Sequence, residues 1–195
     1  MGTETPGPGG ALLGVVDVLE RLGIPYVIGG SIASAAHGEF RSTNDADVLI
    51  ELKADQVPGL LEALGPGFFI EESAVLDALS RRGSFNVIDS RGFEKVDLFV
   101  SGGSLLDRCQ LQNARLMTLP GFESRPVRVT APEEIVIRKL VWFRSGRHVS
   151  DRQWRDVLGV LKVTGASLNR EAMASLADAS GVLDLLRKAL SESGA

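Results

Sequence analysis

Residues 26–52 read YVIGGSIASAAHGEFRSTNDADVLIEL, and this stretch decides the fold prediction. Its first three residues predict a short apolar strand, and the small residues at positions 32–37 favour a helix soon after it. Over residues 45–52 polar and apolar side chains alternate, which predicts a second strand with Asp45 and Asp47 on one face. A strand-to-helix turn and an acidic strand therefore follow one another closely along the chain.

The turn Gly29-Gly30-Ser31 joins the first strand to the helix, and Ser31 is the predicted N-cap. The N–H groups of a helix's first turn have no partner within the helix, and together with the helix dipole they favour an anion. Glycine lets phosphate oxygens approach the main chain closely, and the serine hydroxyl adds a donor. By itself such a turn is also an ordinary tight turn, so a phosphate site depends on the residues around it.

Asp45 and Asp47 are two residues apart in a predicted strand, so their carboxylates project from the same face. Like charges at that spacing raise the pKa of one group unless a cation or a basic side chain compensates them. Carboxylate oxygens suit Mg²⁺, which completes its shell with water and substrate phosphates. The alternative is an exposed strand end on which Arg41 or another basic residue is the ion-pair partner.

Asp97 interrupts the apolar run of the strand predicted at residues 95–100. A charged residue there is costly unless something compensates it. If this strand pairs with the strand of Asp45, a third carboxylate joins the candidate metal site. Otherwise Asp97 faces outward from a half-buried strand.

The rest of the pattern predicts a mixed α/β core followed by helices. Residues 1–10 are rich in glycine and proline and predict a flexible tail, residues 11–130 the core, and residues 131–195 a helical segment packed on it. Further strands are expected at residues 84–88, 95–100, 115–119 and 127–129. Helices are expected at residues 12–22, 54–64, 73–82, 132–144, 154–161 and 183–190.

Composition limits the possible functions. With 195 residues, 44% of them hydrophobic, the chain suits one compact domain with a helical appendage. A single cysteine, Cys109, and two histidines exclude a disulfide framework and favour oxygen ligands for any metal. No secretory signal or membrane-length segment is recognisable, so a cytoplasmic location is expected. The net charge is -4, yet residues 131–165 hold seven basic and four acidic residues, which form either a solvated helix surface or an anion-facing one.

Together these features resemble the nucleotidyltransferase superfamily, whose signature is a glycine-rich turn, a short helix, an Asp-x-Asp strand and a third acid on a later strand. The residues that match this signature are Gly29, Gly30, Ser31, Asp45, Asp47 and Asp97. Residues 29–33, 37–38 and 41–47 are especially similar to the toxin-type branch related to the abortive-infection nucleotidyltransferases. Residues 132–134, 138–140 and 147–156 are similar to the helical segment of that branch. The resemblance covers residues 24–161.

The resemblance implies the nucleotidyltransferase fold, with a mixed β-sheet core, flanking helices and a C-terminal helical bundle. It also implies transfer of a nucleoside monophosphate from a nucleoside triphosphate to an acceptor hydroxyl, with release of pyrophosphate. Asp45, Asp47 and Asp97 would hold two Mg²⁺ ions, and the turn would bind phosphates. Further residues expected to bind the triphosphate are Lys139, Arg147 and Arg41. For Lys139 and Arg147 a solvated helix charge is the alternative.

The acceptor is expected to be tRNA or a protein side chain, and a cognate antitoxin is an expected partner, as in the toxin-type relatives. One alternative is an antibiotic nucleotidyltransferase that acts on a small hydroxylated drug, although the basic stretch at residues 138–162 favours an anionic acceptor. Another is a catalytically silent binding module, such as an antitoxin that keeps the fold. The presence of all three aspartates favours retained chemistry.

Overall fold

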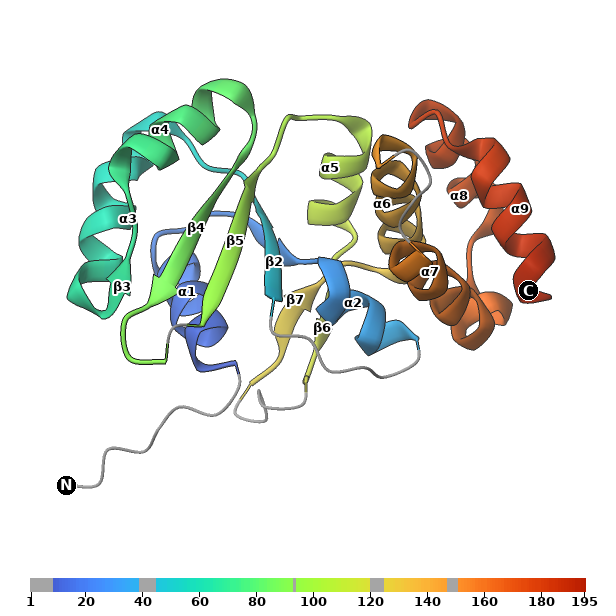
Figure 1. The fold of residues 1–195 in the computed structure, drawn as a ribbon, viewed down its shortest axis with the longest axis horizontal. Coiled ribbons are helices and arrows are strands. Elements are labelled where there is room, and N and C mark those ends of the chain that lie inside the picture. The colour runs from blue at the N-terminus through green and yellow to red at the C-terminus, as the bar shows by residue number, and fades with distance from the viewer. Residues whose placement is uncertain (1–8, 39–44, 93, 120–124, 147–150) are drawn as a thin grey trace. The chain divides into compact units, whose positions relative to one another are not determined.

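The computed structural model of the chain describes residues 9–38, 45–92, 94–119, 125–146 and 151–195. These residues form a mixed α/β fold with a seven-stranded sheet and flanking helices, and with helices again at the C-terminal end (Figure 1). The fold class predicted from the sequence is therefore confirmed. None of the described helices combines the length and the apolar character needed to cross a membrane.

Internal contacts divide the chain into two compact units. The sheet unit comprises residues 1–28, 43–102 and 116–128. The helical unit comprises residues 29–42, 103–115 and 129–195. The helical unit thus takes in two segments that precede the C-terminal helices in the sequence.

The strands of the described sheet follow the order β3-β4-β5-β2-β1-β7-β6. Their bounds are β1 (Tyr26–Ile28), β2 (Asp45–Ile50), β3 (Phe68–Phe69), β4 (Ser84–Asp89), β5 (Lys95–Val100), β6 (Arg115–Met117) and β7 (Val127–Val129). β2 runs parallel to β5, whereas β1 pairs with β2, and β4 with β5 and β3, in antiparallel fashion. The parallel pair at the centre brings two strands together that are far apart in the sequence.

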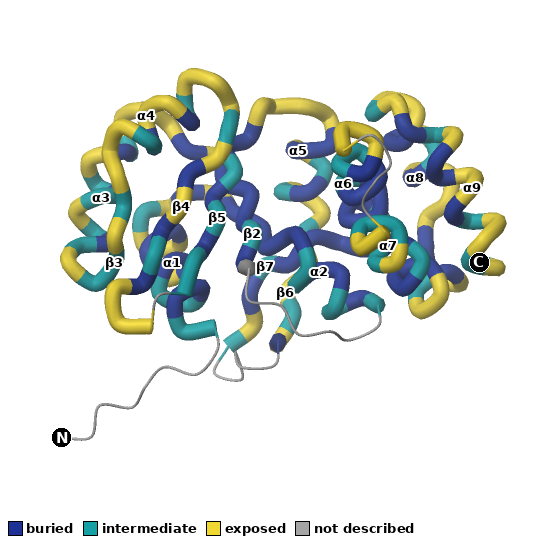
Figure 2. Tube along the Cα trace, in the orientation of Figure 1, coloured by how far each residue is buried: buried dark blue, intermediate teal, exposed yellow. Residues whose placement is uncertain are grey.

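One face of the sheet is covered by helices of the sheet unit. These are α1 (Gly10–Arg21), α3 (Val57–Leu64) and α4 (Glu72–Arg81), with 3₁₀ turns at Ala54–Gln56 and Gly65–Gly67. α1 and α4 contact β5, α4 also contacts β4, and α3 packs against α1 and α4. Along β5 the side chains of Val96, Leu98 and Val100 are buried, and the residues between them are partly exposed (Figure 2). This alternation assigns the even-numbered side chains of β5 to the core.

The helical unit is built around α6. Its helices are α2 (Gly30–His37), α5 (Leu105–Gln112), α6 (Pro132–Ser145), α7 (Asp151–Thr164), α8 (Arg170–Ala179) and α9 (Leu183–Ser193), with a 3₁₀ turn at Gly165–Ser167. α6 contacts all of the other α-helices of this unit, and α2 packs against both α6 and α7. Ile135, Val136 and Ile137 are consecutive and fully buried, as expected for a helix with neighbours on several sides.

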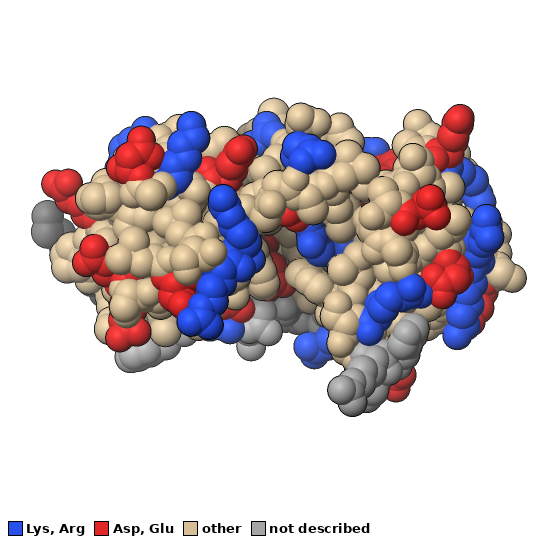
Figure 3. Space-filling view, turned by 90° about the horizontal axis from the view of Figure 1, so that it is seen from above, with Lys and Arg blue, Asp and Glu red and all other residues tan. Residues whose placement is uncertain are grey.

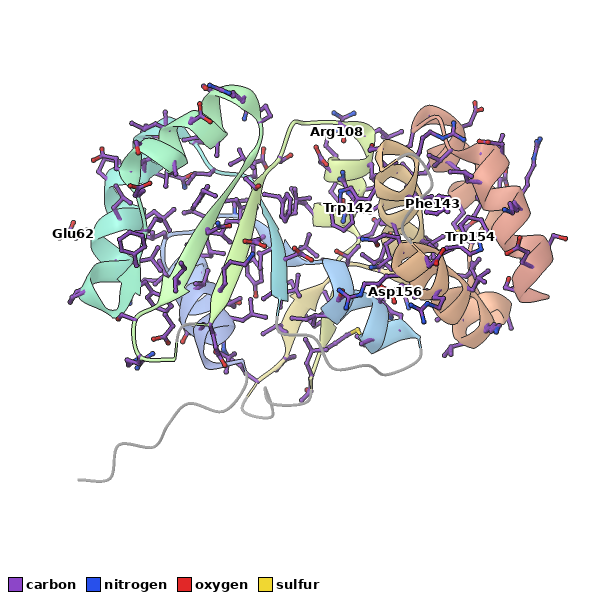
Figure 4. All side chains as sticks on the ribbon, in the orientation of Figure 1. Glu62, Arg108, Trp142, Phe143, Trp154 and Asp156 are labelled. Atoms are coloured by element: carbon purple, nitrogen blue, oxygen red, sulfur yellow. The ribbon has the colours of Figure 1, made fainter. Side chains whose placement is uncertain are left out.

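An aromatic contact joins α7 to its neighbours. The ring centroids of Phe143 on α6 and Trp154 on α7 are 5.1 Å apart (Figure 4). The indole Nε1 of Trp154 donates a hydrogen bond to Glu192 Oε2 on α9 at 2.8 Å. The ammonium of Lys188, also on α9, lies 4.9 Å from the centroid of the Trp154 ring. Trp154 therefore links α6, α7 and α9 through packing and polar contacts.

Several local predictions need correction. The N-cap of α2 is Gly29, and Ser31 lies inside the first turn, so the prediction of Ser31 as N-cap is wrong. The helix expected over residues 54–64 begins as a 3₁₀ turn and becomes α-helical at Val57. The strand expected over residues 45–52 ends at Ile50.

Candidate active site

The two acidic strands are neighbours in the sheet. β2 and β5 pair in parallel with Asp47 opposite Asp97 and Asp45 opposite Lys95. Register partners on adjacent strands project from the same face of a sheet, and so do residues two apart on one strand. Asp47, Lys95 and Asp97 therefore share a face, which is the face opposite to the buried Val96 and Leu98. The pairing on which a third carboxylate depended is present.

Only one of the two carboxylate oxygens of Asp97 has a polar partner among the described residues. Lys95 Nζ lies 2.8 Å from Asp97 Oδ2, and the side chain of Asp97 is 17% exposed. Its other oxygen, Oδ1, is buried and has no hydrogen-bond partner among the described residues. A buried carboxylate oxygen without a partner is unfavourable, because it has lost its water and gained nothing in exchange. This oxygen is a polar group that a bound cation would satisfy.

The neighbouring strand adds a polar side chain to this surface. Asn86 on β4 is the register partner of Asp97 on the other side of β5, and it is exposed. We call the surface formed by Asp47, Asn86, Lys95 and Asp97 the carboxylate face. Asp47 on this face is half-buried. The carboxylate face thus combines two acids, one amide and one ammonium on adjacent strands.

The donor set fits a hard divalent cation. Mg²⁺ is bound in proteins by one or two carboxylates, with substrate phosphates and water completing the shell. Asp47 and Asp97 offer two carboxylates in register, and Asp97 Oδ1 is an oxygen in need of a partner. Among the side chains that the structure describes, no group of three acidic, histidine or cysteine residues converges as a complete metal cage. The side chain of Asp45 lies outside that description, and its main chain is in β2.

The glycine-rich turn opens the helical unit. Gly29 follows Ile28, the last residue of β1, and Gly30 has a φ of 54°. Residues with a Cβ atom are strained in this left-handed region, so position 30 requires glycine. The carbonyl oxygen of Gly29 accepts the first helical hydrogen bond, from the N–H of Ala33 at 3.0 Å. The second glycine of the motif is thus required by the main-chain conformation of the turn.

The first turn of α2 has the properties of an anion site at the level of the main chain. Its N–H groups precede the first i to i−4 hydrogen bond, and the helix dipole is positive at this end. The side chain of Ser31 is half-buried within this turn, and Ser34 Oγ donates to the carbonyl of Gly30 at 2.9 Å. Phosphate binding by Gly29, Gly30 and Ser31 remains a prediction.

Lys139 is buried rather than solvated. It lies on α6 with 1% of its side chain exposed, and its ammonium donates to Asp156 Oδ2 at 2.7 Å and to Gln153 Oε1 at 3.0 Å, both on α7. Asp156 lies on α7, where Figure 4 shows its side chain. The alternative of a solvated helix charge is therefore wrong for Lys139. The ammonium already has a carboxylate partner, so a phosphate would have to share it with Asp156. The role of Lys139 as a phosphate ligand remains a prediction.

Two predicted nucleotide-binding residues cannot be placed. Arg41 and Arg147 lie outside the described residues. Their roles rest on the sequence.

A second group of polar side chains, most of them buried, lies inside the helical unit. Arg138 on α6 pairs with Asp107 on α5 and donates to Gln110 Oε1 from Nε at 2.9 Å. His37 Nε2 lies 2.7 Å from the carbonyl oxygen of Thr130, and burial lowers the pKa of the imidazole. These contacts connect α5 to α6, and α2 to the residue that follows β7.

Glu134 is a buried acid of this unit with one oxygen unsatisfied among the described residues. Asn113 Nδ2 donates to Glu134 Oε1 at 2.6 Å, while Oε2 is buried without a hydrogen-bond partner among the described residues. Burial raises the pKa of this carboxyl. Protonation at Oε2 would lower the cost of its burial, so this group favours the neutral form more than an exposed glutamate does.

Two residues of the carboxylate face were not predicted. Lys95 is two residues before Asp97 in the same strand, and this spacing already places the two on one face. That signal was available in the sequence. Asn86 belongs to the face through the register of β4 against β5, which no local pattern reveals.

No protein-family model matches the sequence. No curated protein matches it either.

Solved structures with the nucleotidyltransferase fold are similar to this chain. An antigenic nucleotidyltransferase-like protein from Paracoccidioides brasiliensis aligns with a TM-score of 0.53 and 20% identity over 94% of this chain and 90% of its own. The antibiotic-resistance factor ANT(2'')-Ia in complex with adenylyl-2''-tobramycin aligns with a TM-score of 0.51 and 17% identity over 87% of this chain and 94% of its own. Its solution structure gives a TM-score of 0.50 and 16% identity over 87% of this chain and 88% of its own. At this identity the similarity establishes the shared fold.

Proposed function

We propose that the chain is a Mg²⁺-dependent nucleotidyltransferase, which moves a nucleoside monophosphate from a triphosphate to an acceptor hydroxyl and releases pyrophosphate. The observation that carries this proposal is the register of Asp47 and Asp97 on parallel strands, with the buried Asp97 Oδ1 lacking a partner. A sheet face with two carboxylates in register is a suitable place for a cation that binds phosphates. The fold shared with ANT(2'')-Ia supports the class of reaction.

Asp47 and Asp97 would hold the metal, together with Asp45 as the resemblance implies. Mg²⁺, when bound, neutralises charge that develops on the triphosphate as pyrophosphate leaves. Asp97 is placed next to Asn86, so an acceptor hydroxyl approaching this part of the face would meet both a carboxylate and an amide. A carboxylate at hydrogen-bond distance can hold the proton that the hydroxyl loses.

The turn at the start of α2 would bind phosphate oxygens through its main-chain N–H groups and Ser31. Gly29 is bonded to Ile28, whose register partner Val48 follows Asp47 in β2. The covalent chain therefore passes directly from the strand beside the acids to the phosphate-binding turn. Lys139, Arg41 and Arg147 would contribute positive charge to the triphosphate and the leaving pyrophosphate.

The acceptor is proposed to be a hydroxyl of tRNA or of a protein side chain, as the resemblance to the toxin-type branch implies, with a cognate antitoxin as regulator. Exposed basic residues of α7, namely Arg152, Arg155 and Lys162, support an anionic acceptor. Elsewhere on the molecule Lys and Arg are interspersed with Asp and Glu in the view of Figure 3. α7 has three basic and two acidic residues on a chain of net charge -4, and such a small local excess favours selective rather than general polyanion binding.

The test incubates the protein with Mg²⁺ and each α-labelled nucleoside triphosphate, together with separated pools of tRNA, protein and hydroxylated antibiotics. Label is expected in the tRNA or the protein pool, and pyrophosphate release should match it. Label in the antibiotic pool would instead identify a small-molecule enzyme. Absence of pyrophosphate release with every nucleotide and every pool would refute the enzymatic function.

Substitutions connect the activity to the carboxylate face. Asp47→Asn and Asp97→Asn keep the size of each side chain and remove its charge, so labelling should fall by at least about a hundredfold. Asp55→Asn is the matched control, because Asp55 is exposed in the same unit and outside the face. Full activity of Asp97→Asn would show that the assigned face is not the metal site.

A further inference from the structure

The carboxylate face contains a cation of its own. Lys95 contacts Asp97 Oδ2 at 2.8 Å, and its main chain is in register with Asp45 on β2. Positions 45, 47, 95 and 97 thus form two adjacent rows on the sheet, one with Asp45 and Lys95 and the other with Asp47 and Asp97. Three of these positions carry acids and one carries a base. The single base compensates part of the acidic charge without any metal.

The ion pair and a metal ion compete for the same carboxylate. A divalent cation at Asp97 repels an ammonium that is 2.8 Å from one of its oxygens. The side chain of Lys95 is 40% exposed, so the ammonium has room to leave Asp97 and keep its hydration. An anion that arrives with the metal, such as a triphosphate, offers the displaced ammonium a new partner.

We propose that Lys95 is a resident counter-ion of the carboxylate face. It neutralises Asp97 when no metal is bound, weakens binding of a free divalent cation, and moves to the triphosphate when a metal–nucleotide complex binds. Lys95 therefore makes metal binding depend on the nucleotide. This inference rests on the proposed function, because that function places a divalent cation at Asp47 and Asp97.

The test measures Mn²⁺ binding by electron paramagnetic resonance, with and without a non-hydrolysable nucleoside triphosphate, and needs no turnover. Lys95→Met keeps the length of the side chain and removes its charge, and it should tighten binding of free Mn²⁺ by about tenfold. The same variant should lose most of the increase in Mn²⁺ affinity that the nucleotide gives to the wild type. Lys95→Arg keeps the charge and should behave as the wild type does.

Control variants separate this inference from the proposed function. Lys162→Met removes the same charge from an exposed position on α7 and should leave Mn²⁺ affinity unchanged. Asp97→Asn should abolish Mn²⁺ binding at this face. Lys95→Gln replaces the methionine variant if that one does not fold, as judged by circular dichroism.

The outcomes are distinguishable. If Asp97→Asn abolishes binding while Lys95→Met and the wild type bind free Mn²⁺ equally, the metal site stands and the counter-ion role is refuted. If Asp97→Asn binds Mn²⁺ as the wild type does, the metal assignment itself fails, and the role of Lys95 fails with it.

Discussion

The buried pair of Lys139 and Asp156 gives a prediction with a definite size. Lys139→Met keeps the aliphatic stem in place and takes the ammonium away from a carboxylate that is only 9% exposed. Removing one partner of a buried ion pair costs about 3–5 kcal/mol, because the other charge stays buried after losing the opposite charge beside it. For a chain of 195 residues this corresponds to a decrease in Tm of about 10 °C.

The assay can be confined to the unit that contains the pair. The chain has two tryptophans, Trp142 and Trp154, and they lie on α6 and α7, the two helices that the pair connects. Tryptophan fluorescence during urea unfolding therefore reports directly on this packing. The free energy of unfolding from that signal should fall by about 3–5 kcal/mol in Lys139→Met.

The double variant Lys139→Met, Asp156→Leu completes the cycle. It removes both charges, and since apolar side chains replace buried pairs at little cost, it should recover most of the lost stability. Lys162→Met, on the exposed side of α7, should change the unfolding free energy by less than about 0.5 kcal/mol. A loss below about 1 kcal/mol in Lys139→Met, or a double variant no more stable than it, would refute the reasoning.

Further predictions follow from the turn and from the buried groups of the helical unit. Gly30→Ala and Gly181→Ala both place a side chain at a positive φ, 54° and 69° respectively, and each variant should lose about 1–2 kcal/mol of stability. Only Gly30→Ala should also lose nucleotide binding, measured in a filter assay. Burial raises the pKa of Glu134, so between the ordinary and the raised value the folded state binds more protons than the unfolded state, and stability falls as pH rises. Glu134→Gln should therefore gain stability relative to the wild type as pH increases through that window, and a difference independent of pH in urea titrations would contradict this. Trp154→Phe removes the hydrogen bond to Glu192 at 2.8 Å and should cost about 1 kcal/mol, with faster amide exchange in α9 as the readout.

Much of the fold follows from local patterns that need no tertiary information. The strands at residues 26–28, 95–100 and 127–129 have the predicted bounds, because apolar runs closed by glycine, proline or charged residues define them. The helix α5 was not predicted, because it has few apolar residues. Its capping box was nevertheless a usable signal in the sequence, and in the structure Ser104 Oγ accepts a hydrogen bond from the N–H of Asp107 at 3.1 Å. β3 is two residues long and exists only through its pairing with β4.

The candidate site could be predicted only in part from such local patterns. Alternation placed Asp45 and Asp47 on one face of a strand, but the position of Asp97 depended on sheet order. That order is set by packing between strands whose paired residues are 50 positions apart in the sequence, as in the pairing of β2 with β5. The burial of Lys139 was also out of reach, because a basic residue on a helix gives the same local pattern whether it faces water or a carboxylate of the next helix.

The interleaving of the two units affects how this protein is made on the ribosome. α2 belongs to the helical unit, but every described strand of the sheet is synthesised before α6 and α7, against which α2 packs. The glycine-rich turn that opens α2 is therefore translated early and gains its supporting helices late. A nascent chain, or a truncated one that ends after β7, would have the acidic strands but not the helices that hold the turn.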